Sequence, residues 1–564
     1  MPSLLAALPS RANLVDILLY YALFRILKWL MKPLYAPSLL RYIPGPPPES
    51  WFSGNLGQLF NGKGLPFHQE LVDLYGGMVK VYGFFGDEQL YISDPRALQS
   101  ILVKEQDAYE ETAVFVETNR VIFGPGLVST TGAIHKRQRK LVNPIFSPSN
   151  LRDLVPAFYS VAERLTDVLI RECRARADLE GSGAVIDMSE WMSRAALEAV
   201  GQTVLGYSFD PLDSPVNNPY TSAIRELIPT IFSLSLVRQF APFLVRLGPP
   251  WMRRRLVEWI PNAAVQKVKT CADVMHQTAV DILADTREGL RREDGGKGAR
   301  AKDIIGLLLR ANQTATSNEQ LSEEELTGQM TVMIFGAQDT SSSALSRILY
   351  MLSVNPDIQE AVRREIRAAR ASDRRLSLEE ISALPWLDAV LKETLRLYPP
   401  VPFVRRTALE ERTIPFTTPS GKLSEVTIPR GATLFLGIAG ANRLRSVWGS
   451  DAAEWRPERW LEGDLHHKVD PSVRLPGIYS GMMSFLGGQR SCIGYKFAQI
   501  EIKILLIAMI SRFEISSTKD EIVWNLSQII SPSVRTVPES GGIAREEKGL
   551  PLCMKLIEEH DVDP

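Results

Sequence analysis

The sequence predicts a single large domain that is mainly α-helical with small β-sheets (α+β), preceded by an N-terminal membrane anchor. Long helical hydrophobic patterns dominate after residue 135, and such periodicity is typical of helices. Short strand-like runs occur near residues 78–92 and again near 414–433. The length of 564 residues would ordinarily correspond to several domains of about 150 residues each, yet no internal repeat or interdomain linker is evident. We therefore expect an anchor over residues 1–43 and one domain over residues 44–564.

The composition is that of an ordinary globular protein, with 45% hydrophobic and 23% charged residues and a net charge of −1. Such a balanced charge gives no general attraction to nucleic acid, so we expect no nucleic-acid partner. The four cysteines are far apart and form no Cys-x-x-Cys pair. This pattern argues against a disulfide scaffold or a Cys-rich zinc site and favours a reducing compartment. One of the four could then be a lone functional thiol. They are Cys173, Cys271, Cys492 and Cys553.

An apolar segment near the N-terminus predicts the membrane anchor. From Leu14 to Met31 the chain is mostly apolar and approaches the roughly 20 residues that a bilayer-spanning helix needs. Arg25, Lys28 and Lys32 share one helical face, so a helix lying in the membrane interface is an alternative, as is a buried amphipathic helix. More basic residues follow the segment than precede it. The positive-inside rule then predicts that the body of the protein faces the cytosol.

The most informative stretch is Phe485–Gly494, which reads FLGGQRSCIG. Its glycines, Gly488 among them, allow a tight turn or the close approach of a flat ligand. Gly494 opens a strongly apolar helical run, which predicts that Cys492 lies at a helix N-terminus. The helix dipole and the free N–H groups there favour a thiolate. Arg490, two residues before the cysteine, offers a fork of donors to a carboxylate.

A thiolate on such a turn has three chemical roles: nucleophile, redox centre or metal ligand. A nucleophile would need a histidine base and a redox centre a second cysteine, and neither lies nearby in the sequence. A haem iron needs one thiolate, close backbone approach and basic groups for its propionates, all of which are present locally. A lone cysteine in an apolar segment is otherwise most often a small buried hydrophobe.

With its Phe-x-x-Gly-x-Arg-x-Cys-x-Gly pattern, the sequence resembles the cytochrome P-450 family of haem-thiolate monooxygenases. It is most similar to membrane-bound eukaryotic members, in particular fungal members of secondary metabolism. The resemblance implies the cytochrome P-450 fold and haem b (iron protoporphyrin IX) as cofactor. It further implies that Cys492 is the axial iron ligand, that Arg490 contacts a propionate and that Phe485 packs near the thiolate. Gly488 and Gly494 complete the implied cofactor-binding loop.

The segment Ser322 to Val354 is predicted to form a long helix with a capping box at its start. In its middle, the stretch Gly336–Ser341 (GAQDTS) sets small residues before an acid and a hydroxyl, which loosens a helix and supplies proton carriers. Alone, this pattern also fits a polar helix face. Beside the cysteine motif it resembles the family's oxygen-activation helix, with Ala337 where the family usually has glycine. The resemblance implies that Asp339 and Thr340 deliver protons to dioxygen.

Glu393 and Arg396 lie three residues apart on a predicted helix that begins at Pro385. Ion pairs at this spacing are common and weak on protein surfaces, so the pair alone means little. The later segment Arg456–Trp460 (RPERW) resembles the family's PERF motif. The resemblance implies that Glu393, Arg396 and Arg459 form a buried structural network behind the haem.

A dense basic run, His135–Lys140, fits a solvated helix face or a nucleic-acid patch when taken alone. The family has Trp-x-x-x-Arg here, and this sequence carries His135 in place of the tryptophan and keeps Arg139. The resemblance implies that both contact haem propionates, with Arg406 or its neighbour Arg405 as a further contact. The other basic residues predict a docking face for an acidic electron donor. They are Lys136, Arg137, Lys140 and Lys496.

The resemblance implies a monooxygenase that inserts one oxygen atom from O2 into a lipophilic small molecule, such as a terpenoid or another secondary metabolite. Electrons would come from NADPH through a separate cytochrome P-450 reductase, with cytochrome b5 as a second donor, at the endoplasmic reticulum membrane. A reductase-independent isomerase or dehydratase and a silent haem sensor are alternatives, but neither needs the proton carriers Asp339 and Thr340. Family topology also implies apolar substrate walls. They include Phe115, Val116, Ile122, Phe123, residues 228–232, Phe335, Val401, Phe403 and residues 529–534.

Overall fold

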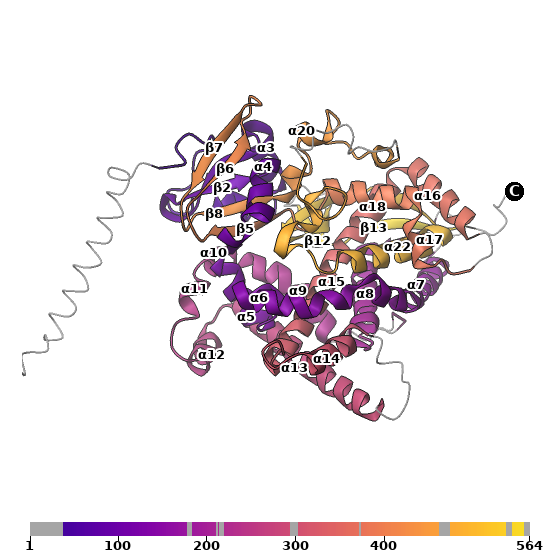
Figure 1. Ribbon diagram of the computed structural model, residues 1–564. Helices are drawn as coiled ribbons and strands as arrows, with labels where there is room; N and C mark the ends of the chain where they lie inside the picture. The colour runs from indigo at the N-terminus through magenta and orange to yellow at the C-terminus, as the bar shows by residue number, and fades with distance from the viewer. Residues whose placement is uncertain are drawn as a thin grey trace, which may run out of the picture.

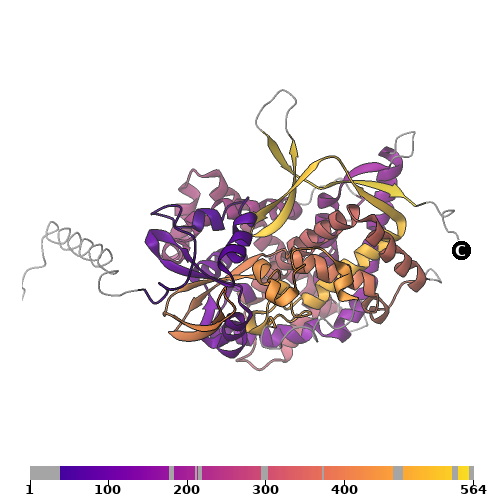
Figure 2. The same cartoon turned by 90° about the horizontal axis from the view of Figure 1, so that it is seen from above.

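The computed structural model describes residues 38–176, 183–209, 212–213, 219–293, 303–370, 374–461, 474–536 and 544–557. The first strands (indigo) gather at one end of the molecule, and helices make up most of the remainder (Figures 1 and 2). Mainly helical structure with several small sheets confirms the predicted fold class. No helix in the described ranges is long and apolar enough to cross a bilayer. The apolar segment of the predicted anchor, residues 14–31, lies outside these ranges.

The largest sheet has five strands in the order β1-β2-β8-β5-β3, and the β2–β8 pair is parallel whereas the others are antiparallel. Its strands are β1 (Met78–Tyr82), β2 (Glu88–Ile92), β3 (Tyr109–Glu111), β5 (Phe403–Ala408) and β8 (Thr433–Gly437). Two three-stranded sheets and one hairpin complete the β structure. Their strands are β4 (Ala184–Asp187), β6 (Arg412–Thr417), β7 (Leu423–Ile428), β9 (Phe513–Ser517), β10 (Glu521–Ser527), β11 (Ile529–Thr536), β12 (Arg545–Lys548) and β13 (Pro551–Leu556).

Two long helices form the centre of the molecule, α15 (Glu323–Ser353) and α22 (Tyr495–Arg512). Apolar residues surround α22 on all faces, which is the pattern of a helix buried inside a large protein. The other helices pack around this pair (Figure 1). They are α2 (Leu56–Leu59), α3 (Leu65–Tyr75), α4 (Pro95–Gln99), α5 (Ala113–Phe123), α6 (Gly132–Val142), α7 (Pro148–Arg176), α8 (Met188–Val200), α9 (Pro219–Ser233), α10 (Ser235–Arg238), α11 (Ala241–Leu244), α12 (Pro250–Trp259), α13 (Ala263–Glu293), α14 (Ile304–Thr314), α16 (Pro356–Ala369), α17 (Leu378–Ser382), α18 (Pro385–Leu397), α19 (Ile438–Ala441) and α20 (Arg445–Trp448).

Local signals in the sequence set several helix ends as predicted. The hydroxyl of Ser322 accepts from the Glu325 N–H, and the Glu325 carboxylate accepts from the Ser322 N–H, so the capping box at the start of α15 is confirmed. Helix α18 begins at Pro385, where a missing N–H costs nothing. These ends depend on neighbouring residues only, which is why the sequence reveals them.

Strand β5 and the five C-terminal strands are absent from the sequence-based expectation. The segment Phe403–Ala408 reads FVRRTA, and its two arginines hide the apolar alternation that marks a half-buried strand. Both arginines nevertheless lie within the fold, because β5 pairs with β3 on one side and β8 on the other. Tertiary pairing therefore decides this strand, and β5 supplies one wall of the site.

Candidate active site

A cavity lies between α15, α18, α22 and β5, beneath the loop that precedes α22. Its volume is about 200 Å³. Most of its lining is apolar, with one thiol, one guanidinium and three hydroxyls among the polar groups. The lining residues are Thr340, Ser341, Ala344, Leu395, Pro400, Val401, Val404, Ile438, Ser484, Phe485, Leu486, Arg490, Cys492, Ala498 and Ile502.

The loop before α22 is folded back on itself around Cys492. The Cys492 N–H donates to the carbonyl of Phe485 over 2.9 Å, and Leu486 has φ +57°, a left-handed conformation that costs a non-glycine residue energy. Gly488 has φ +71°, and a Cβ there would lie 1.8 Å from the carbonyl oxygen of Leu102. Glycine at 488 is therefore required by the packing of this loop against a distant segment.

The Cys492 sulfur faces the cavity, so the residue counts as exposed although protein surrounds it. Helix α22 begins at Tyr495 with Gly494 as its N-cap, so the predicted place of the cysteine beside a helix N-terminus is confirmed. Burial raises the pKa of the thiol, and the Gly494 N–H and the Arg139 charge offset this in part. The effect of burial on the thiol pKa thus outweighs that of the helix N-terminus. The thiolate therefore depends on a cation bound to the sulfur, because a metal deprotonates a coordinating thiol outright.

Four predicted basic residues gather near the cavity. His135 is buried, and the three arginines Arg139, Arg406 and Arg490 all act on its charge state. Burial, with the charges of Arg490 and Arg139, lowers the pKa of His135 to about 3. The imidazole is therefore neutral at physiological pH and keeps one N–H to donate. Helix α6 carries His135 and Arg139, while β5 carries Arg406.

Each arginine of this group has protein partners, but one remains incomplete. Arg490 donates to Glu110 over 2.5 Å, and Arg139 donates to the Ser491 hydroxyl over 3.1 Å. Arg406 pairs with Glu111 over 2.7 Å, yet its buried Nη2 has no hydrogen-bond partner. A buried guanidinium nitrogen without an acceptor is costly, so this position suits an anion.

The residues present fit a haem group. A thiol faces the cavity, and an unsatisfied guanidinium nitrogen belongs to the cationic group beside it, which matches an iron ligand and a receptor for propionates. A Cβ built on Gly494 or on Gly336 would meet no atom within 4 Å. Phe485 also lines the cavity, with its ring 6.1 Å from that of Tyr495. The structure therefore brings these predicted cofactor residues together around one space.

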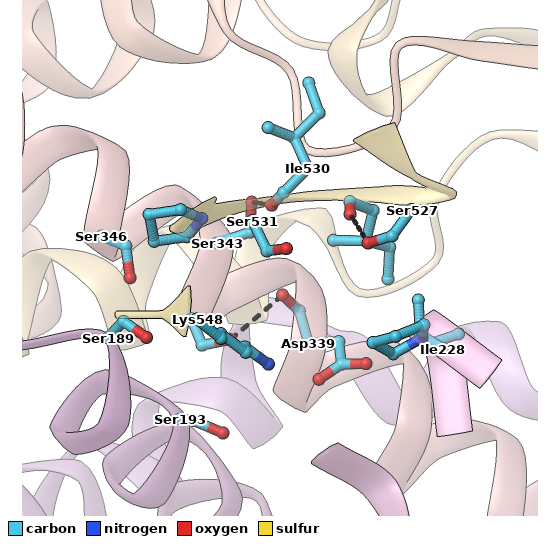
Figure 3. Close-up of a pocket in the computed structure, with 14 residues that line it drawn as sticks. Ser189, Ser193, Ile228, Asp339, Ser343, Ser346, Ser527, Ile530, Ser531 and Lys548 are labelled. Atoms are coloured by element: carbon cyan, nitrogen blue, oxygen red, sulfur yellow. Dashed lines mark hydrogen bonds between the residues drawn. The ribbon is translucent and has the colours of Figure 1, made fainter. Parts of the chain in front are cut away.

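Asp339 and Thr340 are consecutive residues of α15 that face different spaces. Thr340 lines the cavity beside Cys492 and donates its hydroxyl to the Gly336 carbonyl over 2.7 Å. Asp339 faces a separate polar pocket, where Lys548 of β12 approaches it (Figure 3). Burial raises the pKa of Asp339 to about 6, although the Lys548 charge lowers it in part. An acid with this pKa exchanges protons readily near neutral pH.

The polar pocket around Asp339 is lined mainly by serine residues from α8, α15, β10 and β11 (Figure 3). Neighbouring Gln338 donates to the Ser193 hydroxyl over 3.0 Å and leaves its buried Oε1 without a partner. Such a lining suits bound water. The pocket residues are Ser189, Ser193, Ile228, Pro229, Asp339, Ser342, Ser343, Ser346, Ser527, Ile529, Ile530, Ser531, Pro532 and Lys548.

Glu501 is a site residue that the sequence-based reasoning missed. It is fully buried on α22, and its Oε2 lies 2.6 Å from the hydroxyl of Ser341, which lines the cavity. Burial raises the pKa of Glu501 to about 8, so this acid keeps its proton at neutral pH. The available signal was a lone glutamate within the apolar run 495–510, because an acid there must be either paired or neutral.

The Glu393–Arg396–Arg459 group is buried and complete. Both carboxylate oxygens of Glu393 accept from Arg396 over 2.8 Å, and Arg459 adds a contact of 3.3 Å. The Trp460 indole donates to the same carboxylate over 3.0 Å. The arginine contacts lower the pKa of Glu393 although burial opposes them. The chain thus ties α18 to the segment that carries Arg459.

Three of the four residues of the predicted docking face form ion pairs with acids. Lys136 pairs with Asp107 over 2.8 Å and Lys140 with Glu319 over 2.5 Å. Arg137 pairs with Glu325. Exposed pairs of this kind are worth little and exchange readily, so the docking face stays a prediction.

The structure places the predicted substrate walls in different surroundings. Val401 lines the cavity, but the Phe403 ring stacks on His68 at 4.7 Å, among the aromatic rings beneath the sheet. Ile529 and Ile530 line the polar pocket of Asp339 instead. Side chains alternate between the two faces of a strand. Because the sequence did not predict β5, it could not show which face of the sheet each of the residues 401–406 occupies.

Comparison with known proteins places most of the chain in one family. The family model for cytochrome P-450 matches residues 44–536. A cytochrome P-450 monooxygenase (number 91) of Postia placenta is 39% identical over 92% of this chain and 97% of its own length. A ganoderic acid synthetase of Ganoderma lucidum is 36% identical over 86% of this chain and 90% of its own.

The chain belongs to the cytochrome P-450 family, and it is a P-450 monooxygenase, as its relatives are named. The predicted enzyme class is therefore confirmed, and its relatives include a protein of fungal secondary metabolism. Membership implies a haem iron, dioxygen, electrons from a redox partner and a small-molecule substrate.

Proposed function

We propose that the cavity holds haem b with Cys492 as axial ligand, and that the chain uses it to insert oxygen into a lipophilic terpenoid or related secondary metabolite. One observation carries the assignment of the cofactor site. The buried Nη2 of Arg406 has no partner, in a cationic group beside the cavity that the Cys492 sulfur faces. We assign Arg406, Arg490, Arg139 and His135 to the propionates.

Haem, when bound, supplies the iron on which dioxygen is activated. The chain contributes proton delivery on the side of α15. The Asp339 carboxyl group, with a pKa of about 6, takes up and releases a proton near neutral pH and exchanges it with the polar pocket. Thr340 presents its hydroxyl to the cavity. This hydroxyl transfers a proton from the Asp339 side of α15 to the cavity. The apolar lining excludes water from the rest of the space.

The proposed substrate class has two supports. The cavity lining is mostly apolar, which favours a lipophilic molecule because burying apolar surface drives binding. One relative is named for the synthesis of ganoderic acid. We propose NADPH as the electron source, through cytochrome P-450 reductase with cytochrome b5 as a second donor. Lys136, Arg137, Lys140 and Lys496 form the proposed docking face.

We also propose that the chain lies on the endoplasmic reticulum membrane, with the anchor over residues 1–43 and the body in the cytosol. An exposed apolar face supports this orientation. It includes Trp51, Phe52, Phe85, Val237, Phe240, Phe243, Leu244, Trp251 and Trp259. The Phe84 ring links the two parts of this face, since it lies 5.2 Å from Phe52 and 5.6 Å from Phe240. Exposed aromatic residues of this kind favour the membrane interface.

The test of the proposed function is the Cys492→Ala variant in the full-length holoprotein. We expect the loss of the red-shifted Soret band of the reduced, CO-bound protein and the loss of NADPH-dependent product formation with added reductase. Cys553→Ala is the matched control, because Cys553 lies on β13, away from the cavity lining. A red-shifted band that persists in Cys492→Ala would overturn the ligand assignment.

A further inference from the structure

Arg238 of α10 and Arg405 of β5 are a second pair of arginines that the proposed function does not use. Arg405 donates to the side-chain oxygen of Gln239 over 3.0 Å. The Nε of Arg238 is buried without any hydrogen-bond partner. Among the described residues, no carboxylate lies within ion-pair distance of either guanidinium. Such isolation is unusual for arginine away from bulk water.

The pair lies on the opposite face of the sheet from the haem site. Side chains alternate along a strand, so Val404 and Arg406 face the cavity and its cationic group, whereas Arg405 faces the other way. The Arg405 guanidinium lies over the Phe60 ring at 5.1 Å and near the Phe435 ring at 5.8 Å. Helix α10 lies beside β5 in Figure 1, and the Gln239 hydrogen bond joins the two segments.

Both arginines stay charged at neutral pH. Burial lowers the pKa of each to about 10, and the charge of Arg238 contributes to the shift at Arg405, so the two guanidiniums lie close enough to repel each other. Glu111 also acts on Arg405, but it pairs with Arg406 over 2.7 Å. Both residues are half-buried, and two neighbouring cations that are partly withdrawn from water without a counter-ion are costly, so a bound anion would relieve this cost.

The surroundings define the chemistry of that anion. Guanidinium forks bind the oxygens of carboxylates and phosphates. Exposed apolar residues flank Arg238 along the chain, among them Val237, Phe240 and Phe243. The Phe240 ring contacts Phe84 of the sheet region at 5.6 Å. The combination of two unpaired cations with an apolar surface fits an oxyanion attached to an apolar body.

We propose that Arg238 and Arg405 form a binding site for the oxyanion of an amphipathic molecule, and that this molecule is an acidic lipophilic substrate held by its carboxylate. The substrate half of this inference rests on the proposed function. The same site would accept the phosphate of a phospholipid headgroup, so the experiment separates the two sources.

The first arm uses the full-length holoprotein and measures the binding of palmitate and of 1-hexadecanol by calorimetry. Arg238→Gln and Arg405→Gln are expected to weaken palmitate binding about tenfold to a hundredfold, as expected for hydrogen bonds to a charged group. Hexadecanol, which has the same chain without the charge, should bind all forms equally. Arg255→Gln is the matched control, because Arg255 lies on nearby α12 with its side chain 71% exposed, and it should bind palmitate as the wild type does.

Two results overturn the site: unchanged palmitate binding together with unchanged vesicle binding in both variants, or an equal loss for palmitate and hexadecanol. The second arm measures the binding of phosphatidylcholine vesicles with and without phosphatidic acid. A loss confined to the phosphatidic acid vesicles supports the oxyanion site and overturns the substrate assignment. The Soret band of the reduced, CO-bound variants reports that they are folded. Calorimetry does not depend on turnover, so it tests the site even if the proposed reaction is wrong.

Discussion

Two buried arginines in this molecule, Arg396 and Arg406, differ in whether every guanidinium N–H group has an acceptor within the chain. Arg396 is fully buried, and its three nitrogens donate to both Glu393 oxygens and to three backbone carbonyls, so all five N–H groups have acceptors. Arg406 is almost as deeply buried, at 2% exposed, yet its Nη2 has no acceptor. The residue type and the burial are the same. The chain itself supplies every hydrogen-bond acceptor for Arg396, whereas Arg406 retains a donor that a bound anion could satisfy.

The difference separates a structural network from a binding site on physical grounds. Buried polar groups in native proteins nearly always have partners, so an exception calls for an explanation. At Arg406 the neighbouring cavity, with a thiol facing it, supplies the explanation. The comparison therefore predicts different consequences for substitutions that look alike.

The largest effect is expected for Arg396→Ala. It would leave the buried Glu393 carboxylate with Arg459 and Trp460 as its remaining side-chain partners, and breaking a buried pair in this way costs about 3–5 kcal/mol. We expect loss of folded protein, measured as a collapse of the thermal unfolding midpoint in circular dichroism. Arg374→Ala, whose side chain is 54% exposed, serves as control and should unfold as the wild type does. A wild-type midpoint in Arg396→Ala would contradict the structural role.

A smaller effect of a different kind is expected for Arg406→Gln. The substitution removes an incompletely satisfied charge, but it also takes away the partner of the largely buried Glu111 carboxylate, so the thermal midpoint of the haem-free chain should fall by less than in Arg396→Ala. Haem retention should weaken about tenfold to a hundredfold, the worth of hydrogen bonds to a charged group. Haem titration followed at the Soret band checks this. Normal haem affinity together with a midpoint as low as that of Arg396→Ala would make Arg406 a structural residue like Arg396.

The smallest effect is expected at Glu501, a buried acid whose side chain is also only partly satisfied. Glu501 has one partnered and one unpartnered oxygen, and burial raises its pKa from 4.5 to about 8. The folded state therefore holds this proton more tightly than the unfolded chain does. Its contribution to stability is full below the unfolded pKa and is lost as pH rises toward the folded pKa. Glutamine mimics the neutral acid without ionising.

We therefore expect Glu501→Gln to match the wild type at about pH 5 and to have the higher thermal midpoint at about pH 8. Thermal unfolding of both forms across this range is the measurement. Parallel curves would mean that Glu501 is ionised in the folded protein, contrary to its burial.

The sequence alone determined the features that depend on neighbouring residues. The capping box of α15, the start of α18 and the place of Cys492 beside a helix N-terminus each follow from a few adjacent residues. The Phe485–Gly494 motif indicated the family, and the family model confirms it. Local hydrogen bonds and backbone preferences are the same wherever such a segment is found.

Only the tertiary structure decided which side chain faces which space. Arg405 and Arg406 are adjacent, yet Arg405 faces the aromatic rings on one side of the sheet and Arg406 faces the cationic group on the other. The reason is that β5 pairs between β3 and β8. Asp339 and Thr340 likewise face different pockets. Gly488 is required by the carbonyl of Leu102, far away in sequence. These outcomes depend on contacts between segments hundreds of residues apart, which no local pattern encodes.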